Sequence, residues 1–438
     1  MKTRKIGSFV VDNLVVIIFV AFTLAGFILA SDAISISYFL SELIDRVFRN
    51  FFLVLSLIIP VIAGLGLNFG IVIGAMAGNL AIIFVRYQYN SAILADTSPA
   101  VWSGLSGLMI CFIIALPMAM FFGWLTGKLY NRTRGQEMIA SLIVGFFAQG
   151  VYYFVVLFAI GYIIPVPKVH PLIKFDGIGI RMSVDLGMPD AGGLKYALDN
   201  LIRVPFIPLV LAVTLGILAF LLIKFFRNRN KPAQAAKNPW KFRIYVGICV
   251  LVIVICLVSI ITDSSLMYLR KAPLMTGLVV AGLCFFITFL GKTKLGQDFR
   301  SVGQNQHISE ISGINVDRTR IIATIFSTVL ASWGMIIYMQ NMGTMAVYDS
   351  HKNIGLFSVA AILVGGASTS RASVKNALVG AALFNSMTII SSELGPALFG
   401  DPGVGEFFRS FMVYGVIGLA LGLYIWKIVK TQREQNAL

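Results

Sequence analysis

The sequence predicts an all-α, polytopic membrane protein. Of its 438 residues, 58% are hydrophobic and only 12% are charged, which is more apolar surface than a water-soluble fold could cover. Several apolar runs reach the roughly 20 residues that a helix needs to cross a bilayer. The net charge of +16 comes from basic residues spread over alternate loops. This spread is typical of inner loops in membrane proteins and predicts no nucleic-acid partner.

The apolar runs can be followed in order along the chain. Residues 9–30 are too long for the apolar core of a secretory signal, so we expect them to be the first span. Residues 51–86 are interrupted by Pro60 and a series of glycines, and are expected to form two pieces that meet near residues 67–70. The remaining spans are expected near residues 101–126, 136–164, 204–226, 244–262, 274–290, 321–340, 356–368, 376–391 and 409–426.

This pattern predicts a transmembrane domain in two related halves. Residues 1–226 form the first half and residues 244–427 the second. A basic cytoplasmic linker, 227–243, joins them, and a cytoplasmic tail, 428–438, follows. We expect about 10–12 transmembrane or re-entrant helices in the inner membrane of a bacterium, with both termini in the cytoplasm.

Two segments outside the spans have the apolar spacing of amphipathic helices. Residues 37–50 carry Glu42, Asp45, Arg46 and Arg49 on the opposite face, and residues 194–202 close the long outer loop 165–203. We expect both segments to lie on the outer surface of the bilayer as interfacial helices.

The polar segment 296–320 carries the signals of a short helix between two spans. Asn305 is a suitable N-cap, Ile308 and Ile311 fall on one face, and Gly313 suits a left-handed C-cap. Asn315 then begins the next helix, with an acid in its first turn, where negative charge suits the helix dipole. An ordinary solvated loop is the alternative that the spacing alone leaves open.

The same segment resembles a signature of ABC importer permeases for ribose, other simple sugars and nucleosides, a superfamily shared with branched-chain amino-acid permeases. The matching residues are Gly296, Arg300, Val302, Gly303, Asn305, Ser312, Gly313, Ile314, Asn315, Val316 and Arg318. The resemblance implies that this segment is a coupling helix that docks on ABC ATPase subunits. The candidate coupling residues are Gly303, Asn305, Glu310, Ser312, Gly313, Ile314, Asp317 and Arg318. Ile308-Ser309 stands where the family usually has two small residues.

Two glycine-rich breaks, at residues 64–78 and 364–380, are candidates for the substrate pathway. Unwound backbone can line a cavity at the interface between repeats of a transporter, although close helix packing through small residues is the alternative. The resemblance supports the second break, because a Gly-Gly-Thr/Ser stretch occurs there in the family. The candidate pathway residues are Gly66, Asn68, Gly70, Asn79, Gly365, Gly366, Ser368, Thr369, Ser370 and Asn385.

The sequence also indicates where the energy would come from. It contains no G-x-x-x-x-G-K-[ST] phosphate loop, so we expect no enzyme activity and no cofactor in this chain. ATP and Mg would be bound by the partner ATPase. The four cysteines lie in apolar runs and the histidines are scattered, so no metal site is expected.

The predicted function is therefore that of a permease subunit that imports a simple sugar or nucleoside. The expected partners are ABC ATPase subunits, a second permease subunit of the same or a sister chain, an extracytoplasmic solute-binding protein and the lipid bilayer. The alternatives are a permease for branched-chain amino acids or another small metabolite, and an ion-driven secondary carrier. A membrane-embedded enzyme is a further alternative, for which no catalytic cluster is visible.

Overall fold

The computed structural model confirms an all-α polytopic membrane protein. It describes residues 14–29, 35–187, 192–229, 239–261, 272–369, 371–401 and 403–411, together with 414, 415, 418 and 422. Within these residues, six helices are long and apolar enough to cross a membrane, or seven if one bent pair counts as a single span. Three shorter apolar helices accompany them.

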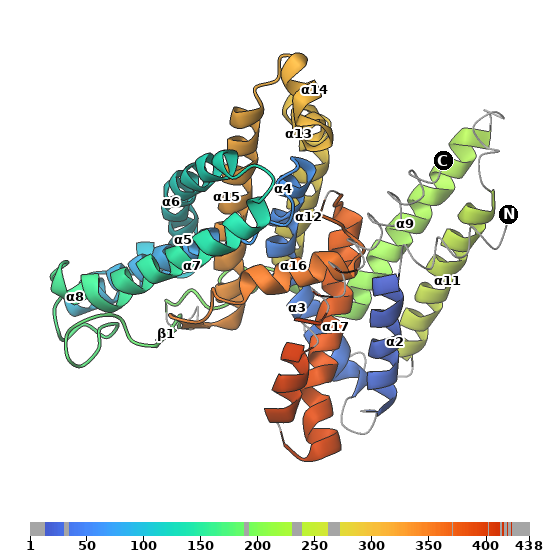
Figure 1. Ribbon diagram of the computed structural model, residues 1–438. Helices are drawn as coiled ribbons and strands as arrows, with labels where there is room; N and C mark the ends of the chain where they lie inside the picture. The colour runs from blue at the N-terminus through green and yellow to red at the C-terminus, as the bar shows by residue number, and fades with distance from the viewer. Residues whose placement is uncertain are drawn as a thin grey trace.

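The helices and strands follow one another as Figure 1 shows. The first part of the chain contains α2 (Leu14–Leu29), α3 (Ile36–Ser56), α4 (Ile58–Ile62), α5 (Ile71–Leu94), a 3-10 turn (Ala100–Trp102), α6 (Gly104–Arg132), α7 (Glu137–Phe154), a π-helical turn (Val155–Ala159) and α8 (Ile160–Tyr162). After the outer loop come α9 (Phe206–Arg229), α11 (Pro239–Ile261), α12 (Leu274–Leu290), α13 (Lys294–Gln304), α14 (Gln306–Ile311), α15 (Val316–Met342), α16 (Ile354–Val364) and α17 (Val374–Phe399).

Two short antiparallel pairs of strands tie the loops to these helices. In one, β1 (Ser183–Asp185) pairs with β4 (Thr344–Ala346), so that Val184 lies opposite Met345. In the other, β2 (Arg203–Val204) pairs with β3 (Ala272–Pro273). The outer loop is therefore fixed near its middle and at its C-terminal end to segments from the second half of the sequence.

Helix α15 lies at the centre of the bundle and packs closely against α5 and α6. A Cβ atom on Gly74 of α5 would lie 2.3 Å from the carbonyl oxygen of Thr328, and one on Gly123 of α6 would lie 2.9 Å from the Cα of Ile325. Glycine at such positions lets helix backbones approach in a membrane, where packing replaces the hydrophobic effect as the main attraction. Several glycines of the first break therefore serve helix packing, as the alternative interpretation held.

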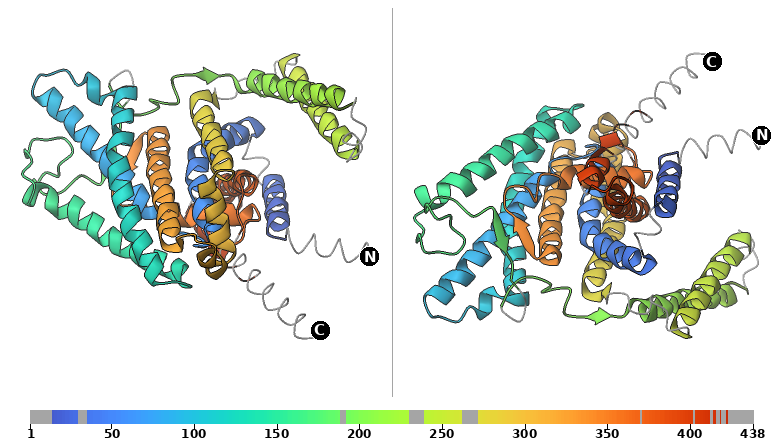
Figure 2. Two further views of the ribbon diagram at one scale, coloured as in Figure 1. Left: turned by 90° about the horizontal axis from the view of Figure 1, so that it is seen from above. Right: turned by 90° about the horizontal axis from the view of Figure 1, so that it is seen from below.

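Helices α9 and α11 form a hairpin to one side of this bundle, as both views in Figure 2 show. Most of the long apolar window of α9 is exposed in the isolated chain. Lipid or another subunit would cover such a surface in a membrane. Of the predicted linker 227–243, residues 230–238 lie outside the described residues, as do most of the predicted span 409–426 and all of the tail 428–438.

Of the two segments predicted to be interfacial helices, the first is helical and the second is not. Residues 37–50 belong to α3, which continues to Ser56, where Leu55 and Ser56 are fully buried. Its polar face looks into a cavity inside the bundle, which replaces the membrane surface as its polar environment. Residues 194–202 form turns, with Tyr196 at a φ of 55°. Leu194, Ala197 and Leu198 are buried, and hydrogen bonds from α12 and α15 to Asp199 take the place of a helix.

Candidate functional site

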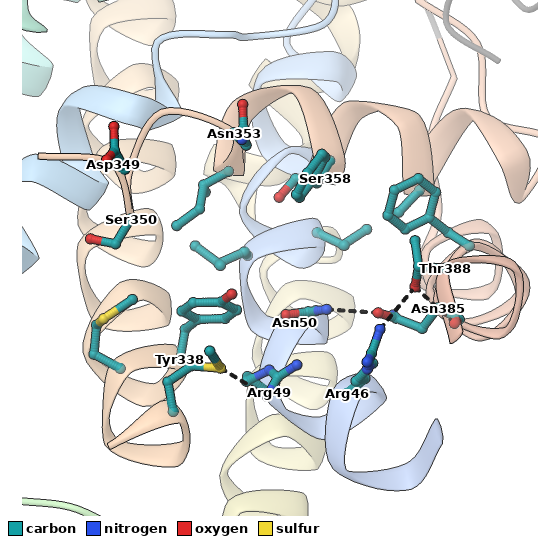
Figure 3. Close-up of a pocket in the computed structure, with 18 of the residues that line it drawn as sticks. Arg46, Arg49, Asn50, Tyr338, Asp349, Ser350, Asn353, Ser358, Asn385 and Thr388 are labelled. Carbon is teal, nitrogen blue, oxygen red and sulfur yellow. Dashed lines mark hydrogen bonds between the residues drawn. The ribbon is translucent and has the colours of Figure 1, made fainter. Parts of the chain in front are cut away.

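A cavity of about 320 Å³ lies between α3, the end of α15, the loop 347–353, α16 and α17. Figure 3 shows its polar side chains converging from these elements. The polar and charged lining residues are Arg46, Arg49, Asn50, Tyr338, Thr344, Asp349, Ser350, Asn353, Ser358, Asn385, Thr388 and Arg409. The volume falls near the lower end of the range for small-molecule sites, roughly 300–1,000 Å³.

Amide and hydroxyl groups from α3 and α17 face each other across one wall of the cavity. Asn50 Nδ2 donates a hydrogen bond of 2.7 Å to Asn385 Oδ1, and Asn385 Nδ2 donates to the carbonyl of Ala381. Arg46 Nη1 lies 3.5 Å from Thr388 Oγ1, while its Nε donates to Glu42 at 2.9 Å. These contacts fix the side chains but leave lone pairs and protons available to a polar solute.

Aromatic rings form the apolar part of the lining. Phe357 of α16 and Phe384 of α17 have ring centroids 6.0 Å apart, and Arg409 stacks over Phe357 at 5.4 Å. Arg49 lies over the ring of Tyr338 at 5.2 Å. A surface of rings with a few oriented polar groups suits a solute that combines a flat ring with hydroxyl groups.

The structure brings one predicted pathway residue into the cavity and places others beside it or elsewhere. Asn385 lines the cavity. Asn79 lies next to the lining, because its Nδ2 donates to Ser350 Oγ at 3.1 Å. At the two breaks, a Cβ on Gly66 would lie 3.9 Å from the carbonyl oxygen of Thr369, so the breaks approach each other. Ser370 lies outside the described residues.

The glycines of the second break hold α16 against α17. A Cβ on Gly365 would lie 1.8 Å from the carbonyl oxygen of Asn376, which leaves room for no other residue there. Asn376 Nδ2 in turn donates to Gly365 O at 2.8 Å. Gly366 has a φ of 82°, a conformation that side chains other than glycine rarely adopt, and Ser368 Oγ accepts from the N–H of Arg371. The break is thus a tightly specified turn beyond the cavity.

Asn68 and Gly70 lie in a separate buried cluster, where α5, α6 and α15 meet. Tyr130 Oη donates to Asn68 Oδ1 at 2.9 Å, and the same oxygen accepts from the N–H of Gly70. Asn68 Nδ2 reaches Ser327 Oγ at 3.4 Å. The amide of Asn68 is therefore satisfied within the protein, and the structure does not bring it to the cavity.

The short helix predicted within the segment 296–320 is confirmed as α14 (Gln306–Ile311). Asn305 caps it by accepting a hydrogen bond from the N–H of Ile308 at 3.1 Å. At its other end Gly313 has a φ of 80°, and the N–H groups of Gly313 and Ile314 return to the carbonyls of Glu310 and Ser309, as in a Schellman motif. Asn315 then caps α15 through the N–H of Arg318.

Helix α14 presents apolar side chains to solvent. Ile308 and Ile311 are 59% and 75% exposed, whereas Ser309 is buried and its hydroxyl donates to the carbonyl of Asn305. The family usually has two small residues where this chain has Ile308-Ser309. Of the two, only the small Ser309 lies on the side of α14 that packs against the protein. Ile308 and Ile311 therefore leave one face of this six-residue helix apolar and exposed.

The loop between α6 and α7 is tied to the same region. Arg134 pairs with Glu310 of α14 at 3.5 Å and with Asp317 at the start of α15, and the Asp317 carboxylate raises the pKa of Arg134. Below them, buried Arg320 pairs with Glu137 of α7 and donates to the carbonyl of Tyr130 at 3.1 Å. The acidic side chains of α14 and early α15 therefore share a partner on one neighbouring loop.

Helix α13, which the sequence analysis did not predict, connects this region to the first break. Thr293 caps α13, which turns by 71° away from α12. Gly303 rests against α4, since a Cβ there would lie 2.1 Å from the carbonyl oxygen of Ile62. The amphipathic pattern of α13, in which Phe299 and Val302 are buried, could have predicted this helix from the sequence.

Most of the residues that line the cavity were not predicted from the sequence. Asn50 and Arg49 were assigned to the outer surface, and Tyr338, Asn353, Ser358 and Thr388 were not singled out. The available signal was the polar stripe of α3 together with the spacing of Asn385 and Thr388, one helical turn apart on α17. Among the described residues, no group of three or more His, Cys, Asp or Glu side chains could hold a metal ion.

Comparison with known proteins places the chain in a family. Residues 178–421 match the family described as the permease component of the branched-chain amino acid transport system. The chain belongs to this permease family. It is accordingly a transport subunit of the ABC type and a multi-pass membrane protein, and from here we call it the permease.

Two curated relatives carry more specific names. The permease is 31% identical over 156 residues to the nucleoside ABC transporter permease protein NupC of Lactococcus lactis subsp. cremoris, which is 34% of this chain and 46% of that protein. It is 30% identical over 112 residues to NupB of the same organism, which is 25% of this chain and 29% of that protein. The matches thus span less than half of each relative. No solved structure matches significantly.

Proposed function

We propose that the permease imports nucleosides, or simple sugars related to them, across the inner membrane of a bacterium. The observation that carries this proposal is the cavity, where amide and hydroxyl groups stand beside Tyr338, Phe357 and Phe384. A nucleoside has a flat base that stacks on aromatic rings and a ribose that exchanges hydrogen bonds with amides and hydroxyls. The names of the two relatives support the same class of solute.

The energy would come from separate ABC ATPase subunits that bind ATP and Mg and contact the exposed face of α14. Helix α15 joins this face to the cavity, and Val316 and Tyr338 are about 33 Å apart along its axis. A push on α14 would reach α4 through the contact of Gly303 with Ile62. Helix α4 directly follows α3, which carries Arg49 and Asn50, so such a push would change the cavity.

The remaining partners complete the cycle. A second permease subunit, of the same or a sister chain, would cover exposed apolar helices. An extracytoplasmic solute-binding protein would deliver the solute to the loop 165–203, on the side of the bundle opposite α14. The loop 133–136 and the segment that carries α14 would then face the cytoplasm, together with both termini.

Uptake in proteoliposomes tests this function. The permease is reconstituted with its ATPase and solute-binding protein, and entry of radiolabelled uridine is measured with ATP or with a proton or sodium gradient. We expect uptake that depends on ATP and is reduced by excess inosine but not by leucine. Uptake driven by an ion gradient without ATP would instead indicate a secondary carrier. Competition by leucine alone would indicate the amino-acid substrates of the family's name.

A further inference from the structure

A buried carboxylate in the outer loop accepts hydrogen bonds from three side chains of the bundle. Asp199 is only 1% exposed, although it belongs to the irregular segment 192–202. Its Oδ1 accepts from the hydroxyl of Thr276 on α12 and, at 2.9 Å, from Gln340 on α15. Its Oδ2 accepts from Asn341 Nδ2 at 2.8 Å. Such a set of donors satisfies a buried carboxylate and fixes the segment to the ends of two helices.

Asn341 passes this constraint to the cavity. Its Nδ2 donates to Asp199, and its Oδ1 accepts a hydrogen bond of 3.1 Å from Arg49 Nη1. A carboxylate can only accept, so it determines which end of the amide faces it. The carbonyl end of Asn341 must therefore face Arg49. Asp199 does not touch Arg49, but it sets the polarity of the group that does.

Arg49 lines the cavity, and not all of the N–H donors of its guanidinium are bonded within the protein. Its guanidinium lies over Tyr338, and its Nη1 also approaches Met342 Sδ at 3.1 Å. Among the described residues, the buried Nε–H of Arg49 has no hydrogen-bond partner. Figure 3 shows this side chain reaching into the lining from α3. Because Arg49 lines the cavity, its guanidinium can donate a hydrogen bond to a solute that carries an acceptor at the edge of a ring.

We propose that Arg49 recognises a hydrogen-bond acceptor on the solute and that Asp199, acting through Asn341, is the residue that positions Arg49. The proposal rests on the proposed function and deepens it, because it predicts which nucleosides pass. Uracil and hypoxanthine present an oxo group where cytosine and adenine present an amino group, and only the oxo group accepts a hydrogen bond. The permease therefore favours oxo nucleosides over their amino counterparts.

The first test compares paired solutes in the reconstituted transporter. Uptake of uridine and cytidine, and of inosine and adenosine, is measured with one preparation of the solute-binding protein, so that its own preference cancels between variants. In Asp199→Asn the new amide turns the amino end of Asn341 toward Arg49. We expect the oxo-to-amino uptake ratio to fall roughly fivefold, which corresponds to the loss of one hydrogen bond.

A reciprocal exchange gives the rescue. In Asp199→Asn/Asn341→Asp, the new amide at position 199 keeps an oxygen for Thr276 and Gln340. Its amino end donates to the new carboxylate at position 341, which also accepts from Arg49. We expect the double variant to regain the wild-type ratio and to regain the Tm lost in each single variant. Thr276→Val is the matched control. It removes a hydrogen bond to Asp199 outside the path to Arg49, so it lowers Tm and leaves the ratio unchanged.

Two results would overturn the proposal. The first is an Asp199→Asn variant that keeps the wild-type oxo-to-amino uptake ratio. If Asp199 had only a structural role, its loss would change the uptake of all four nucleosides by the same factor and leave the ratio unchanged. The second is a double variant that reaches the membrane in normal amount but recovers neither the ratio nor the Tm. If the wild-type permease moves no nucleoside at all, the proposed function fails by itself. The Tm values of the single and double variants then still decide whether residues 199 and 341 form the relay.

Discussion

Gly303 of α13 and Ile62 of α4 touch backbone to backbone, since a Cβ on Gly303 would lie 2.1 Å from the Ile62 carbonyl oxygen. On the other side of this contact, Gly64 has a φ of 74°, and a Cβ there would lie 2.8 Å from the Cα of Gly303. Two backbones that meet without intervening side chains transmit displacement directly, because a packed interface resists compression. This contact joins the segment of the exposed helix α14 to the helix that precedes the first break.

Gly303→Ala should therefore separate ATP hydrolysis from transport. The added methyl group must push α13 away from α4, so we expect uptake to fall at least tenfold while ATPase activity of the assembled transporter persists. Gly282→Ala in α12 is the control, because its Cβ would meet no atom within 4 Å. If Gly303→Ala takes up solute at the wild-type rate when equal amounts of the two proteins are in the membrane, the contact between α13 and α4 does not transmit the motion.

The exposed face of α14 gives a second prediction. Ile311 is 75% exposed, so Ile311→Asp should leave the Tm of the isolated permease within about 1 °C, since exposed substitutions change stability little. It should abolish copurification of the ATPase, because a charge at the core of an apolar contact is costly to desolvate. Ile311→Leu keeps the apolar surface and should retain the ATPase. Full binding by the aspartate variant would place the docking surface elsewhere.

The buried pair of Arg320 and Glu137 predicts a large effect on stability. Arg320 is fully buried, and removing it leaves the Glu137 carboxylate without its cation. We expect Arg320→Met to cost about 3–5 kcal/mol, seen as a fall in Tm in detergent. Arg134→Met removes an exposed cation nearby and should cost little, because exposed pairs contribute about 0–1 kcal/mol.

A second variant separates the ion pair from simple loss of packing. In Arg320→Met/Glu137→Leu no unpaired charge remains, so part of the lost Tm should return. A double variant less stable than Arg320→Met would mean that the carboxylate has a favourable role apart from Arg320.

The segment around α14 could be predicted from the sequence because its signals are local. Asn305, Gly313 and Asn315 each act on backbone groups within about four residues, and cap geometry depends on little else. The structure reproduces all three. The class of fold was equally accessible, because composition and the length of apolar runs determine it.

The cavity could not be predicted in the same way, because its walls come from distant parts of the chain. Asn50 and Asn385 are 335 positions apart, yet their side chains share a hydrogen bond. An amphipathic pattern reports that α3 has a polar face but not what that face meets, and membrane surface and internal cavity satisfy it equally well. The helix predicted at 194–202 was wrong for a related reason, because Asp199 accepts its hydrogen bonds from residues of α12 and α15, which are distant in the sequence.

The last prediction concerns pH and the loop beside the cavity. His351 is fully buried, with its ring 4.6 Å from that of Tyr152, and this burial lowers its pKa to about 4, with a smaller contribution from Lys352. The native protein therefore keeps the imidazole neutral at pH values where the unfolded chain, with a pKa near 6.5, already binds a proton. Stability is fully present above pH 6.5 and is lost as the pH falls toward 4, by up to about 3 kcal/mol.

His351→Phe should flatten most of this decline when Tm in detergent is measured between pH 7 and pH 4.5. Some slope should remain, because burial also lowers the pKa of His170 in the outer loop, and His170→Asn should remove a smaller part. Both variants should match each other in slope above pH 7, where neither histidine is charged in either state. If His351→Phe keeps the full decline below pH 6.5, the imidazole is protonated in the native permease, and the loop must then supply it with a hydrogen-bond acceptor.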